Sequence, residues 1–282
     1  MSTLRLMAVA LVSGLAAHSA VAQVWLLDFG ASNSWRGASQ VGLDANGNAW
    51  NSFPPSWYIG SLVTTGSTSN AAYAPISGSP GTDSYNGPLG TAVSNPLSAA
   101  EVDAAVIDSA ALGLLGGSKA GAVDYMVAQA GRFAIKWLNP KLTYDATFFG
   151  SFKYAADDTK FAAYGDGTYA TEVATVALDV GRGGIYNASR TATLGGLVPT
   201  ATDAAGRQLS FQFGGLSGTS NGYLNSMALY GYIGYLSGGT TVLSGGPAAG
   251  YVAIGNYANG DPRSVDTLIG GGSTVTVNNA NG

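Results

Sequence analysis

Residues 132–151, RFAIKWLNPKLTYDATFFGS, decide the fold. Large apolar side chains alternate there with polar or small ones in two runs: Phe133, Ile135 and Trp137, then Tyr144, Ala146 and Phe148. A period of two is typical of β-strands that bury one face. The connector Asn139-Pro140 separates the two runs, so we expect two strands at the centre of a β-sandwich.

The rest of the chain carries an apolar run and further strand candidates, separated by turn signals. They occupy residues 24–30, 159–164, 171–180, 190–195, 208–213 and 223–235. Short strands at this spacing are typical of antiparallel sandwiches and jelly rolls. We therefore predict an all-β fold, an antiparallel β-sandwich of jelly-roll type, over residues 24–235. The Gly-rich segment 236–282 is predicted to be an edge hairpin, a linker or a frayed end.

One helix is predicted against this β background. Ser98 and Glu101 have the spacing of a capping box, and an apolar run continues from there to Leu115. Apolar residues within the run follow a helical period. We expect a helix over residues 99–114, packed on the periphery of the sandwich.

Residues 1–23 have the pattern of a secretory signal peptide. Arg5 gives a positive start, residues 6–17 are apolar, and Ala20-Val21-Ala22 forms a small-x-small cleavage signal. The alternative, a membrane anchor, needs a longer apolar run. We expect export to the extracellular space, the cell surface or the periplasm, with no transmembrane span left after cleavage.

The sequence contains no cysteine, and its single histidine, His18, lies in the predicted signal peptide. Zinc sites of the usual kind and Ser-His-Asp or Cys-His catalysis are therefore excluded from the mature chain. Removing Arg5 from the 12 basic residues leaves 11 against 16 acidic ones, a net charge of −5. We expect no nucleic-acid partner and no cofactor other than a structural calcium ion.

Three parts of the chain resemble a family of exported bacterial β-sandwich modules. They are LDFG at 27–30 with DANGNAWN at 44–51, LNP at 138–140 with YDATFFGS at 144–151, and GYLNSM at 222–227. Such modules occur in planctomycete-like environmental bacteria, look like galactose-binding-like jelly rolls, and accompany carbohydrate-active enzymes or surface-sorting tails. The resemblance covers roughly 24–235 and implies a binding or surface role. The segment 99–117 looks inserted, and a hydrophobic-plus-arginine sorting tail is missing.

Asp44, Asn46 and Asn48 place oxygen-bearing side chains at alternate positions, as at the start of a calcium loop. A complete EF-hand loop has Gly at its sixth position and Glu at its twelfth, where this chain has Ala49 and Pro55. Two interpretations stay open. The first is a structural calcium ion completed by distant backbone oxygens, and the second is an Asx-type turn joining two strands.

Trp35, Trp50, Trp57 and Tyr58 lie in a polar, loop-rich region together with Asn51. Aromatic faces stack on the apolar faces of sugar rings, while Asn and Asp bind sugar hydroxyls. We therefore predict these five as ligand-binding residues for a polysaccharide or a cell-surface glycan. The alternative is that the rings fill the core, which is favoured for Trp50 because it adjoins the turn.

Three functions follow in order of preference. The first is a secreted, non-catalytic carbohydrate-binding module, favoured by exposed Trp or Tyr beside Asn and Asp. The second is a structural or adhesive protein of the cell surface or extracellular matrix, favoured by buried Trp and an exposed apolar edge. The weakest is a carboxylate-based glycan hydrolase, which needs two facing carboxylates; the only glutamates are Glu101 and Glu172, outside any glycosidase motif.

Overall fold

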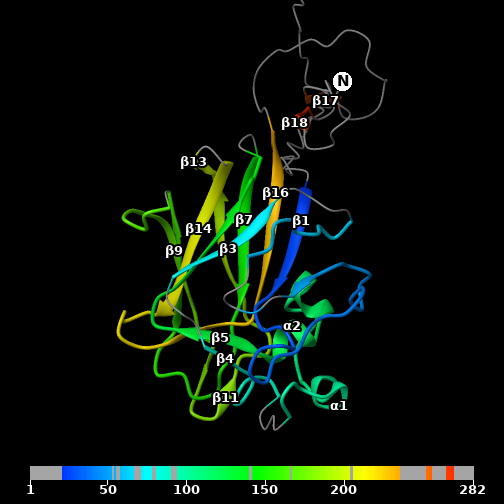
Figure 1. Cartoon of the computed structure of the whole chain (residues 1–282), viewed down its shortest axis with the longest axis vertical. Coiled ribbons are helices and arrows are strands. Elements are labelled where there is room, and N and C mark those ends of the chain that lie inside the picture. Colours follow the sequence, from blue (N-terminus) through cyan, green and yellow to red (C-terminus); the bar gives the residue numbers. More distant parts are fainter. Residues whose placement is uncertain are drawn as a thin grey trace, which may run out of the picture.

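The computed structural model describes residues 21–235 except 53, 55–57, 67–70, 78–80, 90–93, 140–141, 166 and 204–205, together with 252–255 and 265–269. Strands dominate these residues and form several sheets, in which most neighbours are antiparallel. Short helical segments gather at one end of the strands (Figure 1). The predicted all-β class is confirmed, whereas the predicted signal peptide lies almost wholly outside the described residues.

The first main sheet has the order β12-β7-β16-β1-β2. Its strands are β12 (Ala192–Leu197), β7 (Leu142–Phe149), β16 (Ser226–Tyr235), β1 (Val21–Asp28) and β2 (Asn51–Ser52). All neighbours are antiparallel except β1 and β2. In the C-terminal segment, β17 (Val252–Gly255) pairs with β18 (Val265–Ile269), which runs parallel to β16.

The second main sheet has the order β3-β6-β14-β8-β9 and is antiparallel throughout. Its strands are β3 (Ala72–Ser77), β6 (Gly131–Lys136), β14 (Gly206–Gly215), β8 (Thr159–Tyr164) and β9 (Glu172–Leu178), and β13 (Thr200–Asp203) pairs with β14. Two small sheets complete the described part: β15 (Gly222–Leu224), β5 (Tyr125–Ala128) and β4 (Gly81–Asp83), and the pair β10 (Gly181–Arg182) and β11 (Ile185–Tyr186).

The stretch 132–151 forms the two predicted strands, β6 and β7, but the two strands belong to different sheets. The Asn139-Pro140 connector therefore joins the two main sheets. The alternation predicts that Trp137 shares the buried face of Phe133 and Ile135, but the structure shows that it does not. Strand β6 ends at Lys136, and Trp137 has a positive φ of 59° and is partly exposed, so the period of two stops before it.

The main core is an aromatic cluster to which both main sheets contribute. Phe148 of β7 stacks on Phe161 of β8 with ring centroids 4.4 Å apart and an interplanar angle of 4°. It also meets Phe211 of β14 edge-on at 5.8 Å. Ring pairs of this geometry add to the free energy gained by burial. Phe148 therefore contacts two aromatic rings of the opposite sheet.

The opposite face of the first sheet is buried as well. Leu26 of β1 and Ala228 of β16 pack there against Trp50 and against Leu115 from the helical region. This second cluster explains why residues 24–27 of β1 are all apolar instead of alternating, since this part of the strand is covered on both faces.

The helix predicted over 99–114 is wrong in extent. The structure has α1 (Ala99–Asp103), a 3₁₀ turn η1 (Gly113–Gly117) and α2 (Ala120–Val123). The capping box is confirmed, with Glu101 N donating to Ser98 Oγ and Ser98 N donating to the Glu101 carboxylate. Val102 in α1 packs against one apolar cluster and Leu112 belongs to another, so a single straight helix is not formed.

Candidate functional site

The loop after β1 is the organising element of the candidate site, and its base is held by two buried carboxyl groups. Asp28 ends β1, and its Oδ2 accepts a hydrogen bond from Gln40 N at 3.4 Å. Asp124 follows α2, and its Oδ2 accepts one from Ala38 N at 2.8 Å. The Asp124 carboxyl also covers Gly30 so closely that a Cβ there would lie 2.1 Å from Oδ2. The two carboxyl groups thus lie against Gly30 at the start of the loop 30–40 and accept hydrogen bonds from Ala38 and Gln40 at its end.

Burial controls the protonation of both carboxyls. It raises the pKa of Asp28 from 3.8 to about 7, although hydrogen bonds from Ser52, Gln40 and Gly30 act in the opposite direction. Burial also raises the pKa of Asp124 well above its usual value, and the neighbouring charge of Asp28 raises it further. Both residues are completely buried, so no substrate reaches them in this arrangement. They are not the accessible carboxylate pair that a hydrolase needs.

The tip of the same loop carries an exposed group that we call the aromatic–arginine cluster: Trp35, Arg36, Asp83, Tyr85 and Asn95. The Arg36 guanidinium carbon lies 5.3 Å from the ring centroid of Trp35 and 5.2 Å from that of Tyr85. Arg36 pairs with Asp83 Oδ1 at 3.5 Å. The Arg36 backbone N–H donates to Asn95 Oδ1 at 3.2 Å, and the backbone of Arg36 has a positive φ of 50°.

Asp83 positions the second ring of this cluster. Its Oδ1 accepts the backbone N–H groups of Ser84 at 2.7 Å and Tyr85 at 3.0 Å, which form an Asx turn. The Trp35 side chain is 57% exposed and Tyr85 is 43% exposed. The cluster therefore combines two exposed rings with a guanidinium and a carboxylate that are each about one quarter exposed.

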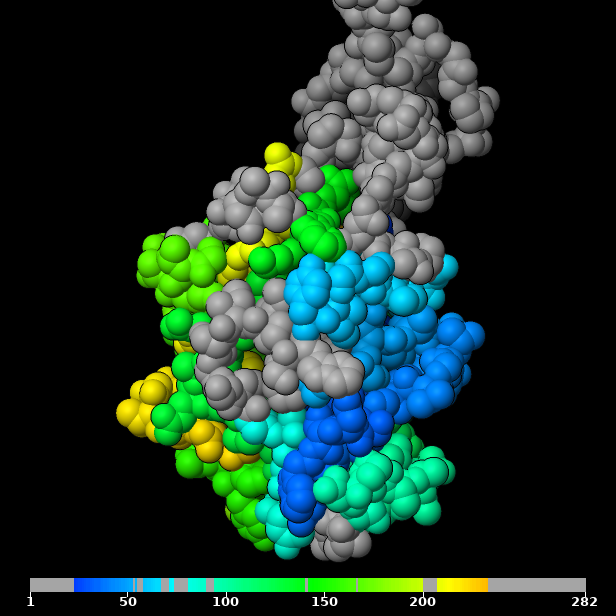
Figure 2. Space-filling view, in the orientation of Figure 1, coloured from blue at the N-terminus to red at the C-terminus, as the bar shows by residue number. Residues whose placement is uncertain are grey.

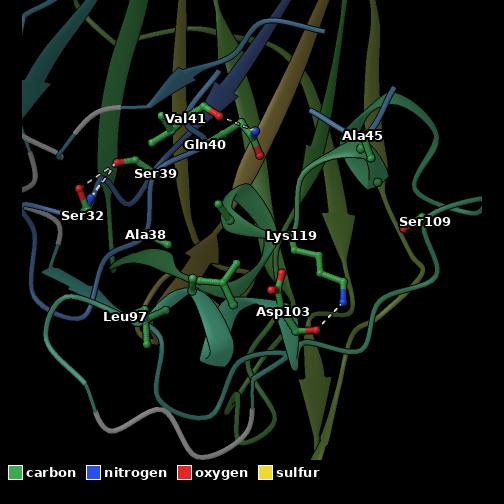
Figure 3. Close-up of a pocket in the computed structure, with 15 residues that line it drawn as sticks. Ser32, Ala38, Ser39, Gln40, Val41, Ala45, Leu97, Asp103, Ser109 and Lys119 are labelled. Carbon is green, nitrogen blue, oxygen red and sulfur yellow. Dashed lines mark hydrogen bonds between the residues drawn. The ribbon is translucent and has the colours of Figure 1, made fainter. Parts of the chain in front are cut away.

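A cavity of about 550 Å³ opens beside the base of the loop. Its walls are residues of the loop, including Ser39 and Gln40, and residues of the helical region, including Asp103 and Lys119 (Figure 3). In Figure 2 the blue loop lies against the blue-green helical region. Much of the polar lining is already bonded within the protein: Ser118 donates to Gln40 at 2.8 Å, and Lys119 Nζ donates to the Asp103 carbonyl at 2.5 Å.

The structure does not bring the five predicted ligand-binding residues together. Trp50 is only 8% exposed, and a Cβ on Gly121 would lie 2.8 Å from its ring, so for Trp50 the core alternative holds. Asn51 is also buried, and its amide bonds to backbone groups of Leu26 and Val63 rather than facing solvent. In this structure both side chains are buried and hydrogen-bonded within the protein.

The other predicted residues have different outcomes. Trp35 is exposed and belongs to the aromatic–arginine cluster. Tyr58 is 55% exposed and meets Trp137 edge-on at 6.4 Å, which makes a second, smaller aromatic surface. Trp57 lies outside the described residues.

The Asp44 loop has the geometry of an Asx turn. Asp44 Oδ1 accepts the backbone N–H groups of Asn46 and Asn48, both at 2.8 Å, and Oδ2 accepts the Trp50 indole N–H at 2.8 Å. Each oxygen of the carboxylate thus already has a donor close by. Nowhere in the described part of the chain do three or more His, Cys, Asp or Glu side chains gather as metal ligands. The structure favours the turn over calcium at Asp44.

This geometry gives a prediction for Trp50. Replacing Trp50 by phenylalanine keeps an apolar ring but removes the N–H that binds the buried Asp44 carboxylate. We expect the free energy of unfolding to fall by about 2 kcal/mol, since a hydrogen bond to a charged group contributes about 1.5–3 kcal/mol. Urea denaturation would measure the loss, with Trp35→Phe as the matched control within about 0.5 kcal/mol of wild type. Equal stability of Trp50→Phe and wild type would contradict the role of the indole.

Sequence reasoning missed Arg36, Asp83 and Tyr85, because no local pattern shows that residue 36 meets residues 83–85. It also missed the pair Asp28 and Asp124. One signal for this pair was present: Asp28 lies between the apolar residues 24–27 and Phe29, and a carboxylate at the end of a buried strand needs a special environment.

Comparisons with protein-family models, with curated proteins and with solved structures find no match to this chain. Within the described ranges, every helix is too short or too polar to cross a membrane. The function must therefore be argued from the geometry of the chain itself.

Proposed function

We propose that this chain is a secreted, non-catalytic carbohydrate-binding module that binds a polysaccharide or a cell-surface glycan through the aromatic–arginine cluster. We propose further that its two main sheets form a β-sandwich of jelly-roll type, like the exported bacterial galactose-binding-like modules that its sequence resembles. The observation that carries the proposal is the exposed Trp35 ring next to Arg36 and Asp83.

The chemistry of the cluster suits a sugar. The C–H face of a pyranose ring is apolar and packs on an aromatic face, while its hydroxyl groups both donate and accept hydrogen bonds. Trp35 and Tyr85 offer the faces, the Arg36 guanidinium offers donors, and Asp83 offers acceptors. Because Arg36 is already held by Asp83 and by two rings, binding costs little side-chain ordering.

The glutamates do not support the hydrolase alternative. Glu101 is used in the capping box of α1. Glu172 accepts hydrogen bonds from Lys160 Nζ at 2.7 Å and from Tyr164. The bond to Lys160 holds the pKa of Glu172 below its usual value, so this group is a poor proton donor at neutral pH.

A structural or adhesive role is the second candidate, favoured by the edge of the second main sheet. Among the described residues of this sheet, strand β9 pairs with β8 alone, and its Val173 is 58% exposed. An edge strand with unpaired backbone groups can pair with a strand of another chain. This role and glycan binding use different surfaces, so a test on the aromatic–arginine cluster separates them.

The test is a glycan-array screen of the purified chain with Trp35→Ala and Arg36→Ala variants. We expect the wild type to bind defined glycans and each variant to bind at least about tenfold more weakly, a loss of about 1.4 kcal/mol. Tyr154→Ala is the matched control, because Tyr154 is 58% exposed, beside Lys153 and outside the cluster. A folded wild type that binds nothing on the array, or a Trp35→Ala variant that binds equally well, would contradict the proposed site for those glycans.

A further inference from the structure

Three buried oxygen-bearing side chains meet on the outer face of the first main sheet, beneath the loop 30–40. Asp28 of β1 and Ser226 of β16 are direct partners in the antiparallel register, so their side chains leave the same face of the sheet. That face also carries Leu26 and Ala228, which pack against Ala122 of α2. Asp124 follows α2 directly, and its charge interacts with that of Asp28.

One oxygen of each side chain has no hydrogen-bond partner. These atoms are Oδ1 of Asp28, Oδ1 of Asp124 and Oγ of Ser226, and all three residues are fully buried. The ion pairs of the described residues include neither aspartate. A buried polar atom without a partner costs free energy, and two neighbouring carboxylates without a counter-charge cost much more. Burial alone favours the neutral, protonated form of both carboxyls, whereas a bound cation would supply the counter-charge that the ionised pair lacks and a partner for the three free oxygens.

The second oxygen of each aspartate is fixed by the protein. The backbone N–H groups of Gln40 and Ala38 donate to Oδ2 of Asp28 and Oδ2 of Asp124, which orients both carboxyls and leaves Oδ1 available. Gly30 lies against the Asp124 carboxyl at a distance that no side chain would tolerate. The loop is therefore shaped around these carboxyls.

We infer that Asp28, Asp124 and Ser226 bind one divalent hard cation, for which Ca²⁺ is the natural candidate. The three side chains offer only oxygen donors, which calcium prefers, and two carboxylates balance its charge. Backbone carbonyl oxygens or water complete such a shell in calcium sites generally. The bound cation would lock the base of the loop that carries Trp35. The inference does not rest on glycan binding, because its test measures ion binding and stability.

The test is a thermal melt of the full chain at pH 7.5, first with EDTA and then with 1 mM Ca²⁺ in place of EDTA. At a Ca²⁺ concentration about 100-fold above the dissociation constant, we expect the melting temperature to rise on the order of 5–10 °C. Asp28→Asn and Asp124→Asn should abolish this rise. Ser226→Ala, which removes one neutral ligand, should weaken Ca²⁺ binding about tenfold in isothermal titration calorimetry.

Asp44→Asn is the matched control, because it changes the other candidate calcium position by the same chemistry. It should keep the full Ca²⁺-dependent rise. If the Asn variants do not fold, calorimetry of the wild type and of Ser226→Ala still tests the inference. The wild type is expected to bind one Ca²⁺ per chain. A wild type that binds no Ca²⁺, or a rise that is lost in Asp44→Asn and kept in Asp28→Asn, would overturn the inference.

Discussion

Replacing Phe148 by alanine should lower the free energy of unfolding by about 3–5 kcal/mol, the usual loss for a fully buried Phe. The Phe148 ring is completely buried, stacks on Phe161 and meets Phe211 edge-on. Its removal leaves a cavity between the two main sheets and breaks two ring contacts at once. A loss of this size is a large part of the 5–15 kcal/mol that stabilises a typical domain.

Urea denaturation followed by tryptophan fluorescence would measure this effect. Phe148→Leu restores much of the volume and should cost less than about 1.5 kcal/mol. Val173→Ala, on the exposed side of edge strand β9, is the matched surface control and should stay within about 0.5 kcal/mol of wild type. A Phe148→Ala variant that loses less than about 1 kcal/mol would mean that the sheets do not pack through this ring stack.

Without divalent cation, the protein should lose stability as the pH rises from 5 to 8. The pKa of Asp28 is about 7 in the folded chain and 3.8 in the reference state, because burial disfavours the charged form. Between these values the folded chain binds more protons than the unfolded chain, so the free energy of unfolding decreases with pH. The stabilising effect is complete below about pH 3.8 and is lost as the pH passes 7. Between pH 5 and about 7, at 1.36 kcal/mol per pH unit, the expected loss is on the order of 3 kcal/mol.

Thermal melts in EDTA between pH 5 and 8 would show this slope. Asp28→Asn cannot ionise, so it should flatten the slope and melt above wild type at pH 8. Asp124, whose pKa is also raised, should behave in the same way when it is replaced by asparagine. Asp157→Asn is the control: hydrogen bonds from Ser217 lower the pKa of this surface carboxyl, so its own contribution has the opposite sign. A melting temperature that rises with pH in EDTA would contradict the assignment.

The strands were predictable because their signal is local. The alternation in 159–164 and 208–213 corresponds to β8 and to the middle of β14, each with apolar side chains in the core. The pattern could not show that β6 and β7 lie in different sheets, since pairing depends on residues far away in the chain. The prediction of a helix over 99–114 was wrong in extent for a related reason. Propensity favours a continuous helix over 99–114, but Val102 and Leu112 pack into different clusters.

The candidate site was predictable only where one residue type decides the outcome. Trp35 was found because an aromatic ring in a polar loop is a general sign of a binding surface. Its partners Asp83 and Tyr85 come from a distant turn, and no local feature of the sequence links them to Arg36. The spacing around Asp44 fits either a calcium loop or a turn. Only the hydrogen bonds that its carboxylate accepts in the structure, including the one from Trp50, favour the turn.

The pairing of β1 with β16 has a mechanical consequence. Val21 is opposite Tyr232 and Asp28 is opposite Ser226, so β1 begins and β16 ends at the same end of the sheet, opposite the end at which Asp28 leads into the loop 30–40 (Figure 1). A pulling force between these two strand ends would open their hydrogen bonds one after another, like a zipper, instead of shearing all of them at once. Separation of β1 from β16 would therefore start at the end opposite the loop 30–40, and the force would reach this loop, which carries Trp35, last.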